Sequence, residues 1–265
     1  EAWSAELAAP LGQLAGPVAA HGPPARKGAT TSPASGAVVD WLKPLYESLF
    51  PRRVRHLLGE YYTPDWLADH MLDLVRFTGA PDQRMLDPAC GSGTFLLRAI
   101  RRILATGQQE PPAERLPTEE ACQKVWHRVG RQVVGFDLNP LAVMAAVANC
   151  RMALAAAVGS PADQGLSIER RDTVLESDRQ AANARPPHDQ PRQTPADDRF
   201  DCIAGNPPWI AWDNLPSDYR QATLPLWQHY GLFSLSGNEA RHGGAKKDLA
   251  MLMLYSVADR YLAEG

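Results

Sequence analysis

A short apolar segment that ends in two prolines holds the residues with the most distinctive chemistry. Phe200 to Ala204 has the composition of a buried strand, and the sequence Gly-Asn-Pro-Pro-Trp follows it. Neither proline can continue a helix or a strand ladder, and Pro207 pushes Asn206 into an extended conformation. The Asn206 side-chain oxygen and the Pro207 carbonyl can then accept hydrogen bonds beside the face of Trp209. This arrangement suits a planar ring that carries an amino group; a plain corner with a packing tryptophan is the alternative.

Composition sets broad limits on the chain. Its 265 residues carry a net charge of −3 and are 45% apolar, which fits one α/β domain and excludes a bulk nucleic-acid binder, so any contact with DNA must come from local patches. The four cysteines form no CxxC pair, and we expect reduced thiols in a cytoplasmic protein without a metal site. The stretch Leu141–Val158 contains Asn149 and Arg151, and we interpret it as too short and too polar to span a membrane.

A glycine-rich loop stands between a strand and a helix. Arg84–Asp87 is a short strand that ends in a carboxylate, Pro88–Gly93 turns sharply, and Thr94–Ala105 has the apolar spacing of a helix. Glycines let the backbone approach a ligand, and the start of the helix offers free N–H groups. Leu96 stands where a dinucleotide fingerprint needs its third glycine, and Asp87 would repel a pyrophosphate but attract an ammonium. The loop therefore favours a ligand that bears an amino acid.

Two more carboxylates follow later strands. The strand Gln132–Phe136 ends at Asp137, a position that typically holds ribose hydroxyls. A third strand, Leu166–Glu169, is followed by Asp172, which is either a plain loop carboxylate or a contact to an adenine amino group.

Helix starts and one irregular region complete the local predictions. Thr63 is expected to cap a helix that starts at Pro64, and Asn139 a long helix that starts at Pro140. Ile210–Gly244 is predicted to be irregular, and its aromatic residues among Arg and Lys suit a strand of nucleic acid, a lid or simple packing.

The alternation of strands and helices predicts an α/β fold, with an open and mostly parallel sheet and helices on both faces. Ligands in such sheets bind at the carboxyl ends of the strands. Asp87, Asp137, Asp172 and Asn206 each fall at such an end. We therefore expect a cofactor over the first three strands and a planar amine over the fourth, with the apolar helix Asp248–Ala263 covering the sheet.

The motifs, in this order, resemble those of the S-adenosylmethionine-dependent amino-methyltransferases of DNA with the gamma motif order. The likeness is to the adenine-modifying members of type I and type IIG restriction-modification and related phage-defence systems. It is carried, over roughly residues 40–265, by Gly59–Pro64, Asp87–Gly93, Gly135–Asp137, Asp172 and Asn206–Trp209. Asn-Pro-Pro-aromatic is shared with glutamine and RNA methyltransferases, whereas Tyr-Tyr-Thr-Pro is more typical of the DNA enzymes.

The resemblance implies a Rossmann-like methyltransferase fold, S-adenosylmethionine as the cofactor and a role for each motif. The residues it assigns to the cofactor are Tyr62, Thr63, Pro64, Asp87, Ala89, Gly91, Gly93, Phe136, Asp137, Leu138 and Asp172. Asp87 would lie near the ammonium, Asp137 would take the ribose hydroxyls, Phe136 or Leu138 would flank the adenine, and Asp172 would meet its amino group. The residues it assigns to the target base are Asn206, Pro207, Pro208 and Trp209.

The resemblance also implies a reaction. An adenine flipped out of the duplex would stack on Trp209, and hydrogen bonds to Asn206 and Pro207 would favour a pyramidal amino nitrogen and stabilise the charge that develops on it. No covalent nucleophile is needed, and the chain has no Pro-Cys dipeptide, which argues against a carbon-5 cytosine methyltransferase.

The expected organisation is a connector over residues 1–36 and an incomplete catalytic domain over 37–265, with later strands and the target-recognition domain outside this sequence. The expected partners are double-stranded DNA and a specificity subunit or a recognition domain of the same protein, and no membrane. Two alternatives stay open: a protein-glutamine or RNA methyltransferase with the same motif, and a non-catalytic module that binds S-adenosylmethionine and DNA in a larger complex.

Overall fold

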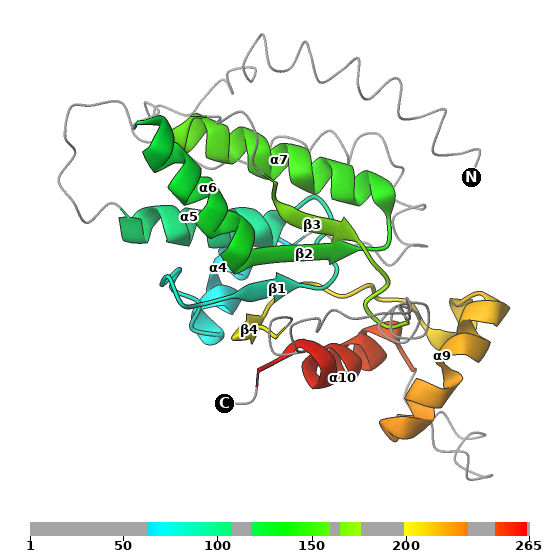
Figure 1. Cartoon of the computed structure of the whole chain (residues 1–265). Coiled ribbons are helices and arrows are strands. Elements are labelled where there is room, and N and C mark those ends of the chain that lie inside the picture. The colour runs from blue at the N-terminus through cyan, green and yellow to red at the C-terminus, as the bar shows by residue number, and fades with distance from the viewer. Residues whose placement is uncertain (1–62, 108–117, 160–164, 176–198, 233–246, 264–265) are drawn as a thin grey trace, which may run out of the picture. The chain divides into compact units, whose positions relative to one another are not determined.

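The computed structural model describes residues 63–107, 118–159, 165–175, 199–232 and 247–263. The chain divides into two compact units, Glu1–Gly36 and Ala37–Gly265. The predicted connector corresponds to the first unit and lies outside the described residues, as does Tyr62. All described elements belong to the second unit (Figure 1).

A parallel sheet forms the middle layer of this unit, in the order β3-β2-β1-β4. Its strands are β1 (Met85–Asp87), β2 (Val133–Asp137), β3 (Ser167–Arg170) and β4 (Cys202–Ile203). Leu86 at the centre of β1 is paired with Val134 of β2 and Ile203 of β4. Since every pairing is parallel, all four strands end along one edge, here called the carboxyl edge, and begin along the opposite edge, the amino edge (Figure 1). The predicted α/β fold with a parallel sheet is confirmed.

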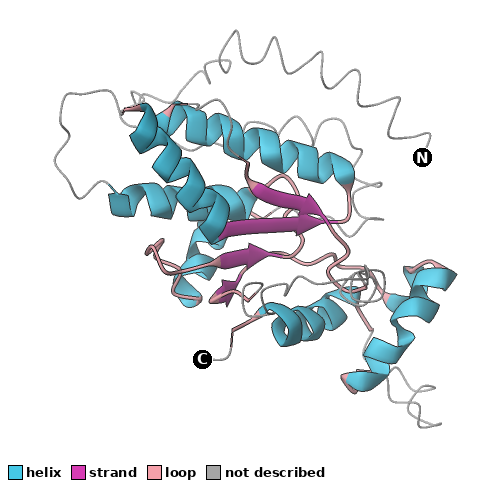
Figure 2. Cartoon of the chain, viewed as in Figure 1, coloured by secondary structure: helices cyan, strands magenta, loops and turns pink. Residues whose placement is uncertain are grey.

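Four helices pack on one face of the sheet (Figure 2). They are α4 (Asp65–Leu74), α5 (Thr94–Gly107), α6 (Glu119–Gln132) and α7 (Pro140–Val158). Their apolar faces share a core with Met85, Val133 and Ile168 of the strands. Asn139 caps α7 as predicted, since its side chain accepts a hydrogen bond from the amide of Leu141 (3.0 Å).

The other face of the sheet is covered by the end of the described chain, which holds η2 (Trp212–Asn214), α9 (Ser217–His229) and α10 (Leu249–Tyr261). Residues of α9 and α10 form a second core with Leu86, Val134 and Phe136. Helices therefore lie on both faces, as predicted.

The prediction that Ile210–Gly244 is irregular is wrong for α9, which contains Pro225 in its interior. An interior proline costs about 3 kcal/mol. Trp227 of the same helix is 1% exposed and packs edge-on against Trp212, with ring centroids 5.3 Å apart. Burying an indole removes on the order of 200 Å² from water, which is worth about 5 kcal/mol and outweighs that cost.

The start of α4 also differs from its prediction. The helix begins at Asp65, and Pro64 is the capping residue with an extended backbone and no side-chain cap. The carbonyl of Pro64 accepts hydrogen bonds from the amides of Leu67 (3.0 Å) and Ala68 (3.1 Å). Thr63 is instead buried ahead of the helix.

The membrane argument made from the sequence needs correction. Among the described helices, α7 alone has the length and apolar composition to cross a membrane, with a mean hydropathy of 1.8. The packing of α7 gives a different reason for its composition. Asn149 is completely buried and donates to the carbonyl of Ser92 (2.9 Å), and Ala146, Cys150 and Leu154 lie in the core. One face of the helix is therefore apolar because it packs into the core of this fold.

Candidate active site

The predicted site residues that follow strands meet along the carboxyl edge. Asp87 ends β1 and is paired with Gly135, two residues before Asp137 ends β2. β4 extends the same edge, because the amide of Ala204 donates to the carbonyl of Leu86 (3.0 Å). Asn206 therefore follows the strand next to the one that ends at Asp87.

The glycine loop is held in place by β2 and uses its two glycines differently. Both have a positive φ, 54° at Gly91 and 93° at Gly93, which side chains rarely adopt. A methyl group on Gly93 would press on Ala146 of α7 at 3.3 Å, so this glycine allows the loop to approach the helix closely. A methyl group on Gly91 would have no atom of the described residues within 4 Å. The described part of the chain therefore leaves the backbone at Gly91 uncovered, which fits a loop that a ligand approaches.

Asp137 organises the glycine loop as well as ending β2. One carboxylate oxygen accepts from the amide of Gly91 and the other from the amide of Asn139, both at 2.8 Å. Burial raises the pKa of Asp137, although these backbone donors act in the opposite direction. The backbone of Leu138 is a further donor to this carboxylate. A carboxylate has about four lone-pair sites, so a hydroxyl donor of a ribose remains compatible with this arrangement.

Asp87 is the most buried carboxyl group of the edge, with 1% of its surface exposed. Among the described residues its side chain receives a hydrogen bond from the amide of Ala89 (3.2 Å). Burial, and then the nearby charge of Asp137, raise the pKa of Asp87 to about 8. A buried carboxylate with so few donors is stabilised by a cation, which is what the ammonium of an amino-acid ligand provides.

Gly205 joins the Asp87 region to the proline motif, and the sequence analysis missed its role. A methyl group at this position would lie far inside van der Waals contact of Asp87 Oδ1 and 3.2 Å from Cδ of Pro88. Glycine is therefore required between β4 and Asn206 if the Asp87 side chain is to keep its place. The signal in the sequence was the glycine itself, directly before Asn-Pro-Pro-Trp.

Residues 206–209, here called the hook, lie at the surface of the edge. Asn206, Pro207 and Pro208 are partly exposed, and 52% of Trp209 is exposed. The predicted acceptor, Asn206 Oδ1, accepts a hydrogen bond from Nε1 of Trp209 at 2.8 Å. Among the described residues, no donor to the Pro207 carbonyl is found. The exposed indole face and the Pro207 oxygen are therefore accessible to a planar ligand.

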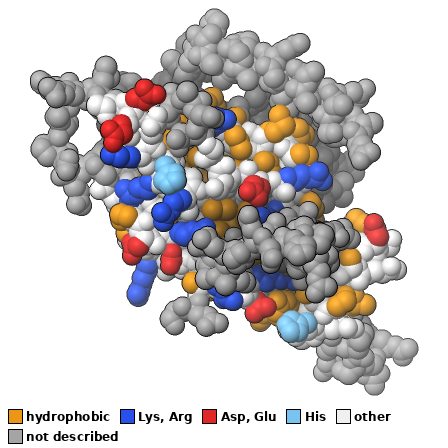
Figure 3. Space-filling model, viewed as in Figure 1, with side chains coloured by type: hydrophobic (Ala, Val, Ile, Leu, Met, Phe, Trp, Pro, Cys, Tyr) orange, Lys and Arg blue, Asp and Glu red, His pale blue; other side chains and the backbone are white. Residues whose placement is uncertain are grey.

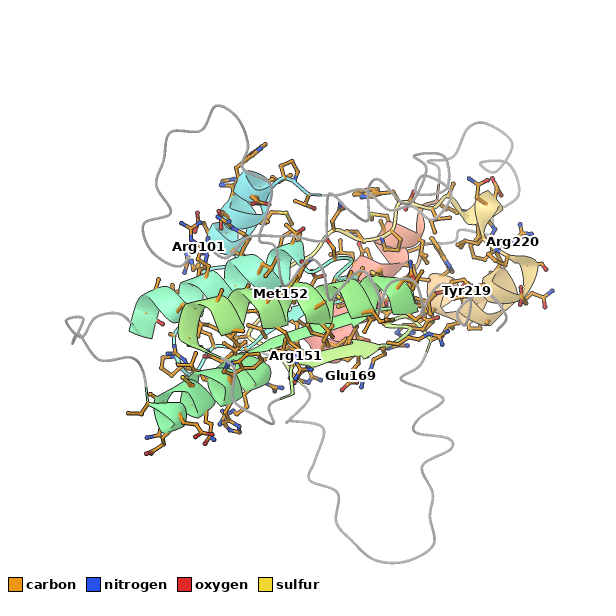
Figure 4. All side chains as sticks on the ribbon, turned by 90° about the horizontal axis from the view of Figure 1, so that it is seen from above. Arg101, Arg151, Met152, Glu169, Tyr219 and Arg220 are labelled. Atoms are coloured by element: carbon orange, nitrogen blue, oxygen red, sulfur yellow. The ribbon has the colours of Figure 1, made fainter. Side chains whose placement is uncertain are left out.

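Asp172 follows β3 and has a partner that the sequence analysis did not identify. Its Oδ1 accepts from the amides of Val174 (2.9 Å) and Leu175 (3.0 Å), and from the hydroxyl of Tyr219 (3.4 Å). Tyr219 lies on α9 (Figure 4). Burial and the adjacent Asp172 raise the pKa of Tyr219, so its phenol stays protonated and can donate. The sequence analysis did not identify Tyr219 as a site residue because it predicted the segment that forms α9 to be irregular.

The two candidates to flank an adenine ring are placed differently. Phe136 is 4% exposed and packs on the α10 side of the sheet, against Tyr261 and under the guanidinium of Arg171, which lies 4.2 Å from its ring centroid. There it lines a depression of about 150 Å³ that the hook and the glycine loop do not border. Leu138 is 53% exposed. Leu138 is therefore the better candidate for contact with a ligand.

Cys90 lies inside the loop but has the properties of a structural thiol. It is 5% exposed, and its amide donates to the carbonyl of Phe136 (2.8 Å). Burial raises its pKa well above the usual range, so the thiolate that a nucleophile requires is disfavoured. All four cysteines are buried free thiols, as predicted.

Comparison with known proteins identifies the family. The family model described as N-6 DNA Methylase matches residues 39–230. The chain belongs to the N-6 DNA methylase family. This assignment confirms the predicted resemblance and supports S-adenosylmethionine as the cofactor.

Individual relatives are more distant or cover part of the chain. The adenine-specific methyltransferase PglX of Streptomyces coelicolor (strain ATCC BAA-471 / A3(2) / M145) is 34% identical over 125 residues, which are 45% of this chain and 10% of PglX. The chain thus spans a small part of the length of this curated relative.

Solved structures of protein–DNA complexes share the fold. The DrdV–DNA complex has a TM-score of 0.54 and 18% identity, over 85% of this chain and 22% of DrdV. The ATP-dependent Type ISP enzyme LlaBIII bound to DNA has a TM-score of 0.50 and 15% identity, over 76% of this chain and 14% of LlaBIII. At these identities the likeness shows the fold alone.

Proposed function

We propose that this chain is part of the catalytic domain of an adenine-specific DNA methyltransferase, which transfers a methyl group from S-adenosylmethionine to the exocyclic amino group of a flipped adenine. The observation that carries the proposal is the common edge: three carboxylates and the hook follow four adjacent parallel strands. Membership of the N-6 DNA methylase family supports the same reaction.

The residues of the carboxyl edge match the parts of the cofactor. Asp87 would hold the ammonium, because the carboxyl group is buried and has few other donors. The open backbone at Gly91 would follow the amino-acid portion, Asp137 would accept from the ribose hydroxyls, and Leu138 would cover one face of the adenine. Asp172, oriented by Tyr219, would accept from the adenine amino group. Thr63 and the undescribed Tyr62 are kept from the sequence prediction as further cofactor residues.

The hook would hold the base to be methylated. S-adenosylmethionine, when bound, supplies a methyl group on a positively charged sulfur. Asn206 Oδ1 and the Pro207 carbonyl would accept the two hydrogens of the adenine amino group, which directs the nitrogen lone pair out of the ring plane and stabilises the charge that develops there. The exposed face of Trp209 would stack on the flipped base. Amide and carbonyl oxygens are not bases at neutral pH, so the proton that the nitrogen then loses passes to water.

We further propose that the partner is double-stranded DNA and that target recognition comes from another domain or a specificity subunit. The DrdV and LlaBIII structures are both complexes with DNA, and the chain spans a tenth of PglX. A role in restriction-modification or phage defence, in the cytoplasm, is also part of the proposal; the likeness to the Type ISP restriction-modification enzyme LlaBIII supports the first of these roles.

The test is methyl transfer from tritiated S-adenosylmethionine to duplex DNA that lacks adenine methylation, with the full-length parent protein. Asn206→Ala removes the acceptor from the hook. Asn214→Ala is a matched control, because Asn214 is an exposed asparagine in η2, eight residues farther along the chain. We expect transfer by the wild type and by Asn214→Ala, and a loss of at least about a hundredfold for Asn206→Ala, the range found for a donor or acceptor that acts in the transition state.

Other outcomes point to the alternatives. Label in RNA or in a protein glutamine, with none in DNA, would show that the substrate is not DNA, while the chemistry assigned to the hook would stand. Cofactor and DNA binding without transfer to any of the three substrates would show a non-catalytic binding module and overturn the proposal.

A further inference from the structure

Trp209 does more in this structure than present an aromatic face. Its indole Nε1 donates to Oδ1 of Asn206 at 2.8 Å, across the two prolines that separate them. Proline fixes φ near −65°, so the backbone between the two residues has little freedom to change this spacing. The ring itself is 52% exposed, so burial does not explain a tryptophan at this position.

The side-chain amide of asparagine has two ends of nearly equal shape and opposite function. The oxygen accepts hydrogen bonds, and the NH₂ group donates them. An adenine amino group is itself a donor, so it can bind the oxygen end and is repelled by the NH₂ end. A rotation of 180° about the last side-chain bond of Asn206 would therefore convert the hook from a binding site into a repulsive one.

The indole N–H distinguishes between these two orientations. With Oδ1 toward Trp209, the donor meets an acceptor; with the NH₂ group there, two donors would face each other at the same distance. Oδ1 has two lone pairs, so an asparagine oxygen can accept from an indole N–H and from an amino group at the same time. Phenylalanine at this position would keep an aromatic face and lose the donor.

We propose that Trp209 is a positioning residue, whose indole N–H holds the Asn206 amide in the orientation that accepts the amino group of the target base. The inference rests on the proposed function and adds a second role for Trp209 besides stacking. It predicts that the indole N–H affects the transfer step more than it affects DNA binding, because the ring face remains when the N–H is removed.

The experiment measures kcat and the KM for DNA with the full-length parent protein and its variants. Trp209→Phe keeps an aromatic face and removes the N–H, and Trp209→Ala removes both. Replacement of Trp209 by 3-benzothienylalanine keeps the size and shape of the indole and puts sulfur in place of the N–H. We expect Trp209→Phe and the benzothienyl variant to lower kcat about tenfold, equivalent to about 1.4 kcal/mol, with KM within threefold of the wild type. Trp209→Ala should in addition raise KM by about tenfold, because a stacking face is lost.

A double-mutant cycle separates orientation from other effects of the indole. Asn206→Asp replaces the amide by a carboxylate, which presents an oxygen in both orientations. In the Asn206→Asp background, the penalty of Trp209→Phe on kcat should therefore fall below threefold. A penalty that stays near tenfold would overturn the positioning role.

The remaining outcomes are distinct from a failure of the proposed function. If the wild type transfers methyl groups and both the Phe and benzothienyl variants retain kcat within twofold, the inference is overturned and the proposed function stands. A higher kcat or a lower KM in these variants would show that the bond blocks the acceptor until a base enters, which also overturns it. No transfer by the wild type to any substrate would overturn the proposed function, and the inference with it.

Discussion

The polar side chains at the two edges of the sheet differ in how they are paired. At the amino edge they are bonded to the protein's own backbone: Gln132 donates to the carbonyls of Ala80 and Gln83, Arg84 donates to the carbonyls of Arg131 and Arg199, and Asp201 accepts from the amide of Arg84. Figure 3 shows Lys and Arg side chains gathered over α6 and this edge.

At the carboxyl edge, the acceptors that follow β1 and β4 have few donors from the protein. Asp87 is buried with a hydrogen bond from Ala89, and burial raises its pKa to about 8. The hook adds the oxygens of Asn206 and Pro207. The comparison indicates that the polar groups of the amino edge stabilise the fold, whereas those of the carboxyl edge are left ready for a ligand that brings donors and positive charge.

The largest effect expected from this comparison is on stability at the amino edge. Gln132→Leu would leave the carbonyl of Gln83 without its side-chain donor and remove one of two donors to the carbonyl of Ala80, and should lower the free energy of unfolding by about 3 kcal/mol. Gln123→Leu on the exposed side of the same helix is the control and should change it by less than about 0.5 kcal/mol. Urea unfolding measures both. If the Gln132 variant retained its stability but lost cofactor affinity, the division of roles between the edges would be wrong.

A smaller effect, on affinity, is expected at the carboxyl edge. Asp87→Asn keeps the shape of the side chain and removes its charge, and should weaken the binding of S-adenosylhomocysteine about thirtyfold, or about 2 kcal/mol, because a charge-assisted bond to the ammonium is lost. Asp82→Asn, on an exposed residue of the preceding loop, should leave the affinity unchanged. Isothermal titration calorimetry measures both. If the wild type and the Asp87 variant bound with equal affinity, the assignment of Asp87 to the cofactor site would be wrong.

The pH dependence of stability tests whether the Asp87 carboxyl group is buried without a cation in the free protein. The pKa of Asp87 is raised from 3.8 to about 8 in the folded protein, so between these values the folded state keeps a proton that the unfolded state has lost. The stability that this proton provides is complete below pH 3.8 and is lost as the pH rises to about 8. The stability of Asp87→Asn relative to the wild type should therefore rise from pH 5 to pH 8. If the difference in the free energy of unfolding between the two proteins stayed constant across this range, the raised pKa assigned to the buried Asp87 carboxyl group would be wrong.

The affinity for the cofactor should depend on pH in the opposite direction. The ionised carboxylate attracts an ammonium, so wild-type affinity for S-adenosylhomocysteine should increase from pH 6 toward pH 8. The affinity should fall again at still higher pH, where the amino group of the ligand loses its own proton. Asp87→Asn should lack the rise on the acid side. Titrations in buffers of constant ionic strength test this, and a rise of equal size in the variant would assign it to another group.

The smallest effect concerns Tyr219. Tyr219→Phe removes the hydroxyl that donates to Asp172 and should weaken S-adenosylhomocysteine binding about threefold, or about 0.7 kcal/mol, the size of a single neutral donor at a carboxylate with other donors. Tyr255→Phe on the exposed face of α10 is the matched control. If both variants bound equally well, the bond from Tyr219 would have no part in holding the cofactor.

Patterns within a few residues were sufficient to predict much of the fold. The glycine loop, the capped start of α7 and the carboxylates after β1 and β2 follow from local steric and hydrogen-bonding rules, and the structure confirms them. α9 could not be predicted in this way, because Pro225 argues against a helix and the burial of Trp227 that stabilises it depends on contacts distant in sequence. The roles of Tyr219 and Gly205 were missed for the same reason, since each depends on a residue more than forty positions away.

The most direct test of the account is the identity of the methylated product. Duplex DNA incubated with the full-length parent protein and S-adenosylmethionine is digested to nucleosides and analysed by mass spectrometry, with Asn206→Ala as the comparison. The account predicts N6-methyldeoxyadenosine from the wild type and its loss in the variant. A methylated cytosine, or methyladenine formed equally well by Asn206→Ala, would contradict the assignment of the hook to an adenine amino group.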